Sequence, residues 1–199
     1  MDRKPFATLL GRRSVRFGQY LGDTIAVEDE EKALDRLDDA MPLIGWVVHA
    51  FSALEQSLAS HICQVINDRT DEPGVIVLQG MQFRQRVDLF DRLSKSFFSA
   101  SREWFDHPTH GLLRPLVDEL MAVGKLRNEI VHADWGSIDE EGFASITIRM
   151  QPEGLHVSRL RLDAPLLEGV VDRIADLIHQ LDDFTQARED LLTANRLPP

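Results

Sequence analysis

Apolar side chains recur every three or four residues in two segments, 42–65 and 83–97. This period places them on one face of an amphipathic helix, which buries that face in a core. Pro42 fits the first turn of the first helix, where its missing N–H has no helical partner to lose. The repeated apolar positions are Val47, Phe51, Leu54, Leu58, Ile62 and Val65 in the first segment, and Phe83, Val87, Phe90, Leu93 and Phe97 in the second.

Two more helices are expected nearer the C-terminus. One begins around Leu112 and ends before Gly136, with Pro115 tolerable only in its first turn. The other is opened by Asp163 and Pro165. The apolar stripes of these helices are Leu113, Leu116, Leu120, Val123, Ile130 and Val131 in the first, and Leu167, Val170, Val171, Ile174, Leu177, Ile178, Leu181 and Phe184 in the second.

Between these two helices the apolar residues alternate with polar ones, which is the period of a strand. The alternation runs through residues 144–150 and 155–157, on either side of a turn sequence at 152–154. It slips by one residue afterwards, so a bulge or bend is expected near Ser158. We therefore predict a mainly α fold: an up-and-down bundle of four to five helices, with a β-hairpin at about 143–162 inserted before the last helix.

The N-terminal part of the chain has a weaker pattern. Residues 1–25 are interrupted by glycines and predict an arm or a short helix, and residues 28–39 are dense in charge, as in a solvated helix or linker. We therefore expect a basic arm and an acidic helix or linker in residues 1–40, and a helical bundle in residues 41–195.

Composition places the chain among ordinary globular proteins. It has 199 residues, 43% hydrophobic and 28% charged, which suits one domain with a proper core. No apolar run approaches the length of a membrane span, and no continuous apolar segment follows the basic N-terminus as in a secretory signal. Cys63 is the only cysteine, which excludes an internal disulfide and a cysteine-based zinc site. We expect a buried Cys63 and a cytoplasmic protein.

The formal charge is −11 and is unevenly distributed. Residues 1–20 carry five basic side chains against one acidic, a net +4, so the remaining residues carry −15. Such an acidic body argues against non-specific binding of nucleic acid, which depends mainly on attraction to phosphates. The basic arm could contact a polyanion, dock on the acidic body or be a solvated tail.

A polar motif interrupts the apolar stripe of the third predicted helix. Arg127 occupies the stripe position four residues after Val123, where a charge needs a partner. Asn128 and His132 are four residues apart and share the flank of the same stripe. One edge of the helix thus carries a guanidinium, an amide and an imidazole. This combination suits an anionic oxygen substrate, because arginine binds phosphate and histidine transfers protons near neutral pH.

The sequence Leu126-Arg127-Asn128-Glu129-Ile130-Val131-His132 resembles the R-x4-6-H motif of the HEPN superfamily, which also lies late in a long bundle helix. The resemblance covers roughly residues 42–190 and implies metal-independent RNA cleavage that leaves a 2′,3′-cyclic phosphate, without a cofactor. His132 would transfer the proton, Arg127 would stabilise the transition-state charge, and Asn128 would orient His132 or bind a phosphate oxygen.

The resemblance also implies partners. In this family the site is usually composite, so we expect a homodimer through the third helix, RNA as a ligand, and a role in a toxin–antitoxin or defence system with an antitoxin or other partner protein. Trp135 follows the motif closely and could form a wall of the site.

Three alternatives assign the motif no catalytic role. Arg127 could pair with an acidic residue inside the bundle, for which Glu55 is a candidate, while His132 caps the end of the helix. The domain could also be a HEPN-like module that binds RNA or protein without cleaving it, or an unrelated helical bundle. The histidines His107 and His110 predict a polar loop rather than a metal site.

Overall fold

The computed structural model describes residues 11–25, 30–66, 72–100 and 102–196. These residues form two compact units, each assembled from separate stretches of the chain. The first unit contains the described residues up to His49 together with Lys125–Asp172, and the second contains those of Ala50–Gly124 and from Arg173 onward. Three long helices contribute residues to both units: α2 (Glu30–Ile66), α6 (Pro108–Val131) and α7 (Ala164–Arg196). The boundary predicted at residue 40 falls inside α2.

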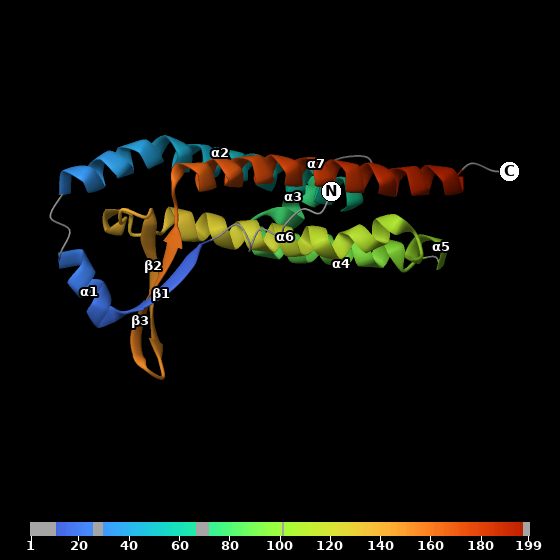
Figure 1. The fold of residues 1–199 in the computed structure, drawn as a ribbon. Coiled ribbons are helices and arrows are strands. Elements are labelled where there is room, and N and C mark those ends of the chain that lie inside the picture. The colour runs from blue at the N-terminus through green and yellow to red at the C-terminus, as the bar shows by residue number, and fades with distance from the viewer. Residues whose placement is uncertain (1–10, 26–29, 67–71, 101, 197–199) are drawn as a thin grey trace. The chain divides into compact units, whose positions relative to one another are not determined.

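An antiparallel three-stranded sheet lies in the first unit (Figure 1). Its strands are β1 (Arg12–Arg16), β2 (Phe143–Gln151) and β3 (Gly154–Arg161), in the order β1-β3-β2. The short helix α1 (Phe17–Ile25) follows β1 directly. The predicted hairpin before the last helix is confirmed, with β2 and β3 as its two strands and Gly154 in its turn at φ 120°.

A bulge lies opposite Ser158, but it is in β2 rather than in the strand that carries Ser158, where it was expected. Ser145 pairs with Arg159 and Thr147 pairs with Ser158, so Ile146 is an extra residue on the β2 side of the ladder. Such a bulge changes which face the following side chains occupy. β3 itself is regular, so Val157 and Leu160 lie on opposite faces of this central strand, and both faces are covered there.

β1 was not expected from the sequence. Its five residues include three arginines and one apolar side chain, Val15, so no alternation is visible. The strand forms because β3 offers a free edge, where Val15 pairs with Val157. The part of the basic arm that the structure describes is therefore docked on the acidic body, one of the three alternatives. Residues 1–10 lie outside the described residues.

The second unit is a helical bundle. Segments of α2, α6 and α7 pack there with α4 (Phe83–Phe98), accompanied by α3 (Glu72–Leu78) and α5 (Arg102–Phe105). Aromatic contacts join the helices: Phe51 of α2 lies 4.7 Å from Phe83 of α4, and Phe90 of α4 lies 5.6 Å from Phe184 of α7 (ring centroids). The predicted apolar faces are mostly buried. The predominance of helix, with one small sheet, confirms the mainly α class. Among the described residues no helix is long and apolar enough to cross a membrane.

The helix directions in this unit do not alternate strictly. Phe98 contacts His110, whereas Phe83 lies against Gly124, so α6 runs antiparallel to α4. α2 and α7 run in the same direction as α4, because residues near the C-terminal ends of all three helices line one pocket. The chain returns between α2 and α4 through α3, whose Gly74 packs on the buried Cys63; a Cβ on Gly74 would lie 2.6 Å from the sulfur. The thiol is thus a core residue, as expected.

Two helices begin earlier than predicted. α2 starts at Glu30 and contains Pro42, and α6 starts at Pro108 and contains Pro115. Each interior proline removes one backbone hydrogen bond, to the carbonyl four residues earlier. Both prolines lie on exposed turns of their helices, so the carbonyl that lacks its helical donor can accept a hydrogen bond from water. The charge-dense stretch from Glu30 onward is therefore helix rather than linker.

Candidate functional site

The predicted motif lies at the C-terminal end of α6, within the first unit. α6 ends at Val131, and the N–H of His132 donates to the carbonyl of Asn128 at 3.0 Å, which closes the last turn. Leu126 and Ile130 are buried and fix the orientation of this turn. Val131, which was assigned to the apolar stripe, is instead 38% exposed. The buried face is therefore narrower at this end of the helix than expected.

The structure brings two of the three predicted catalytic side chains into contact. The Nη1 of the half-buried Arg127 donates to the Oδ1 of Asn128 at 3.0 Å. At about 100° per residue, Arg127 and His132 lie about 140° apart around the helix, whereas Asn128 and His132 lie about 40° apart. The hydrogen bond therefore directs the guanidinium toward the flank that Asn128 and His132 share. Both of these residues are exposed.

Glu129 lies inside the motif, and its charge is compensated. Its carboxylate accepts two hydrogen bonds from Arg12 of β1, at 3.2 Å from Nη1 and 2.6 Å from Nη2. Lys125, one turn earlier on α6, lies 3.8 Å from the same carboxylate. An uncompensated carboxylate beside Asn128 would repel an anionic ligand. The docked strand β1 thus removes the unfavourable charge from the motif.

Trp135 holds the end of the motif helix. It begins a short 3-10 helix, Trp135–Ser137, and its Nε1 donates to the carbonyl of Ile130 at 2.9 Å. The last carbonyls of a helix lack helical donors, so this bond satisfies one of them. The predicted supporting role of Trp135 stays a prediction, but the residue lies next to the motif, as its position in the sequence suggested.

Glu55, the second predicted supporting residue, belongs to the second unit. It is half-buried on α2, whereas the motif belongs to the first unit. Its pairing with Arg127 stays a prediction.

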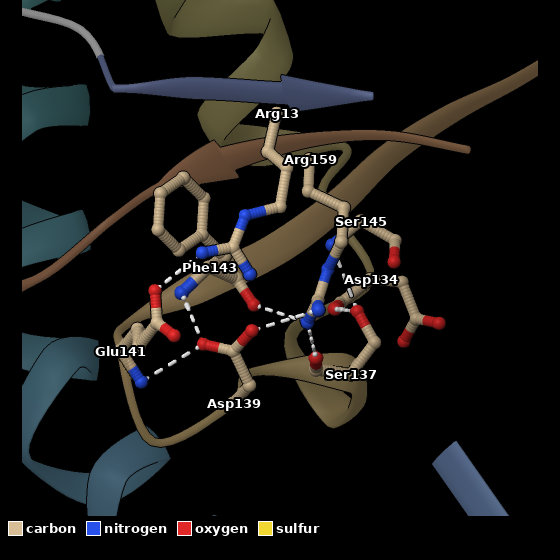
Figure 2. A network of polar contacts seen from close by, with 8 residues as sticks. All are labelled: Arg13, Asp134, Ser137, Asp139, Glu141, Phe143, Ser145 and Arg159. Atoms are coloured by element: carbon tan, nitrogen blue, oxygen red, sulfur yellow. Dashed lines mark hydrogen bonds and ion pairs between the residues drawn. The ribbon is translucent and has the colours of Figure 1, made fainter. Parts of the chain in front are cut away.

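The loop that follows the motif is held by a polar network centred on Arg159 (Figure 2). Arg159 of β3 is only 6% exposed and forms an ion pair with Asp139 at 2.7 Å. Its guanidinium also donates to the carbonyls of Ser137 and Phe143, at 2.7 and 2.6 Å. Asp139 in turn accepts the backbone N–H of Phe143 at 2.9 Å. A buried charge paired and hydrogen-bonded in this way fixes the loop against the sheet.

The outer part of the network ties this loop to both strands of the hairpin and to β1 (Figure 2). The backbone N–H of Asp134 donates to the backbone carbonyl of Ser145 at 2.7 Å. The backbone N–H of Ser145 donates to the hydroxyl of Ser137 at 2.8 Å. Arg13 of β1 pairs with Glu141, and its guanidinium lies 4.5 Å from the centre of the Phe143 ring. The hairpin inserted before the last helix therefore fixes the segment that leaves the motif.

Sequence reasoning missed three buried arginines, although the signal that identified Arg127 was available for two of them. Arg173 and Arg188 occupy stripe positions of α7, three residues after Val170 and four after Phe184. Arg173 pairs with Glu119 of α6 inside the second unit. Arg159 gave no such signal, because the apolar alternation shifts from Leu155 and Val157 to Leu160 and Leu162, which places residue 159 on the polar side.

The histidines at the start of α6 are used locally; His107 precedes the helix, whereas His110 lies in its first turn, so the polar loop predicted for them is partly helix. His107 Nδ1 lies 3.1 Å from the hydroxyl of Thr109, and His110 Nδ1 lies 2.9 Å from the carbonyl of Phe105. In the part of the chain that the structure describes, no group of three His, Cys, Asp or Glu side chains could hold a metal ion. Comparisons with protein-family models, curated proteins and solved structures give no match for this chain.

Proposed function

We propose that the protein is a metal-independent endoribonuclease of the HEPN-like kind, with Arg127, Asn128 and His132 as its catalytic residues. The hydrogen bond from Arg127 to Asn128 carries the proposal, because it directs a cation toward the edge where His132 is exposed. A guanidinium, an amide and an imidazole on one edge can bind a phosphodiester and transfer a proton. Neutralisation of Glu129 by Arg12 supports the same conclusion, since it removes a repelling charge.

The proposed reaction is an internal transesterification. The ribose 2′-oxygen attacks the adjacent phosphorus, the bond from phosphorus to the 5′-oxygen breaks, and the products are a 2′,3′-cyclic phosphate and a 5′-hydroxyl. His132 accepts the proton of the 2′-hydroxyl or protonates the leaving 5′-oxygen. Arg127 stabilises the negative charge on the equatorial oxygens of the transition state, and Asn128 holds Arg127 in place and binds a phosphate oxygen.

One histidine cannot perform both proton transfers in a single turnover. We therefore propose a homodimer in which the ends of the two α6 helices face each other, so that the partner subunit supplies the second imidazole. Light scattering at working concentrations should then give twice the monomer mass; a clean monomer would contradict the composite site. We further propose a cytoplasmic toxin or defence role, with an antitoxin or similar protein as partner.

The deciding experiment compares cleavage of varied RNAs by the wild type, Arg127→Ala and His132→Ala in the presence of a chelator. Both variants should lose at least about 100-fold in rate, as expected when a general acid–base or charge-stabilising group is removed. Arg149→Ala and His49→Ala are matched controls, because both residues are exposed in the first unit outside the motif, and they should retain activity. RNA binding should survive in His132→Ala but weaken in Arg127→Ala.

A second candidate is a non-catalytic module that binds RNA or protein. The half-burial of Arg127 and its hydrogen bond to its own neighbour favour this alternative, since such a guanidinium already has a structural partner. It predicts that pure, folded wild type cleaves no RNA, and that Arg127→Ala lowers stability more than His132→Ala does.

A further inference from the structure

Arg188 has unusual surroundings in the second unit. It is only 6% exposed, on α7, and its Nε is sealed from solvent without a hydrogen-bond partner in the described residues. Its guanidinium lies 5.4 Å from the centre of the Phe97 ring, which stacks on Trp104 at 4.5 Å. Burial lowers the pKa of Arg188, which the neighbouring charge of Glu189 partly opposes. An arginine nevertheless stays protonated, so this is a buried cation.

The other buried arginines of the described chain have carboxylate partners. Arg159 pairs with Asp139, and Arg173 pairs with Glu119. Arg188 has no ion pair among the described residues, although Glu189 is next to it in sequence and exposed. Leaving a buried charge uncompensated costs several kcal/mol. Such a cost is often retained where the group has a ligand to bind.

A pocket opens at Arg188. It has a volume of about 380 Å³, within the range of small-molecule sites, and lies where α2, α4 and α7 meet in the second unit. Much of its lining is apolar, from Val65, Ile66, Leu93 and Leu192. Burying an apolar chain against such side chains is favourable in proportion to the area removed from water.

We propose that this pocket binds an amphipathic monocarboxylate, an organic anion with one carboxylate and an apolar chain. The guanidinium of Arg188 matches the two oxygens of a carboxylate, and the apolar lining matches the chain. A single cation suits a single negative charge, whereas Glu189 and Asp190, both exposed close by, disfavour a dianion such as phosphate. Nothing in this site depends on the proposed ribonuclease activity.

Octanoate is the probe, measured by calorimetry and by thermal unfolding of the full-length protein. It should bind with a stoichiometry of one and raise the melting temperature, whereas octan-1-ol and inorganic phosphate should do neither. Arg188→Met should weaken binding roughly 10- to 100-fold, the range for loss of hydrogen bonds to a charged group. The same variant should melt at a higher temperature than the wild type without ligand, because it removes an uncompensated buried charge.

Ser96→Trp is a second variant that keeps Arg188 but fills the pocket from α4, and it should also abolish binding. Arg92→Met, an exposed arginine on the same helix, is the control and should bind octanoate like the wild type. The proposal is overturned if octanoate fails to bind at millimolar concentration, if octan-1-ol binds as well, or if Arg188→Met binds octanoate normally. Should Arg188→Met not fold, Ser96→Trp decides: unchanged binding in that variant overturns the proposal.

Discussion

The indole of Trp135 reaches back across the end of α6 and donates to the carbonyl of Ile130 at 2.9 Å. Ile130, which lies between Arg127 and His132 in the sequence, is fully buried. Its packing therefore fixes the orientation of the last helical turn. The tryptophan side chain therefore acts as a cap for the helix that carries the motif. Any function of the motif depends on this turn being held in place.

Trp135→Phe tests this cap. The change keeps an aromatic ring but removes the indole N–H of this residue, so the carbonyl of Ile130 loses that donor. The free energy of unfolding should fall by about 1 kcal/mol, the usual cost of one such hydrogen bond. Urea denaturation measures it. Trp46→Phe is the control, because Trp46 is 59% exposed on α2 and should change stability by less than about 0.5 kcal/mol. Equal losses in the two variants would contradict the cap.

The pair between Arg12 and Glu129 should matter more for RNA binding than for stability. Arg12 is 43% exposed, so the coupling energy in a double-mutant cycle should be only about 0.5–1 kcal/mol. Arg12→Ala, however, leaves the charge of Glu129 next to Asn128 and should weaken RNA binding about 3- to 10-fold, by the charge repulsion involved. Filter binding at low salt measures this effect.

Removal of the carboxylate should reverse that loss. Arg12→Ala combined with Glu129→Gln should regain most of the RNA affinity of the wild type. Arg13→Ala is the matched control, since Arg13 pairs with Glu141 outside the motif. If Arg12→Ala and Arg13→Ala weaken RNA binding equally, general charge rather than Glu129 is responsible.

Asp139 should be among the most sensitive residues of the first unit. Asp139→Ala leaves the buried Arg159 without its carboxylate and should destabilise the protein by about 3 kcal/mol. Adding Arg159→Met should recover part of the loss, because it removes the unpaired charge. Arg149→Met, on the exposed part of β2, serves as control for arginine removal. Chemical denaturation gives the free energy of unfolding of all three variants. A double variant less stable than Asp139→Ala alone would contradict the expected compensation.

Two glycines of the first unit should respond to alanine with opposite signs. Gly142 has φ 81° and its added Cβ would lie 3.2 Å from the Cβ of Asp163, so Gly142→Ala should cost about 1–2 kcal/mol. Gly45 lies inside α2 with nothing within 4 Å of an added Cβ, so Gly45→Ala should stabilise by about 0.5–1 kcal/mol. Thermal melts of both variants test the pair, and a stabilising Gly142→Ala would show that its backbone is not constrained.

Periodicity predicted the parts of the fold that depend on local burial. The stripe through Val47, Phe51, Leu54, Leu58 and Ile62 is buried as expected, because an apolar face of a helix has to be covered. The hairpin was also predictable, since its alternation and its turn lie in one continuous stretch. α2 and α6 were predicted too short, because an exposed proline costs one hydrogen bond without ending a helix that packs elsewhere.

β1 and the contacts of the motif were missed because they depend on pairing between distant residues or on a rotamer. β1 has no pattern of its own and exists only because β3 accepts it. For the site, helical spacing predicts that Asn128 and His132 share one flank of the helix. It does not predict the hydrogen bond from Arg127 to Asn128, because the side-chain rotamer of Arg127 decides that contact. It likewise could not predict that Arg12 would neutralise Glu129, which requires the strand pairing first.

The pairing of Arg12 with Leu160 also constrains how the molecule is made. During synthesis β1 emerges from the ribosome long before its partner strand, because residues 17–153 separate β1 from β3. Until then the N-terminal strand has no sheet to join, and Glu129 has no arginine. Closing so long a loop is slow, so completion of the sheet is expected to be a late event in folding, and a nascent chain that stalls before β3 would expose its motif helix without its counter-charge.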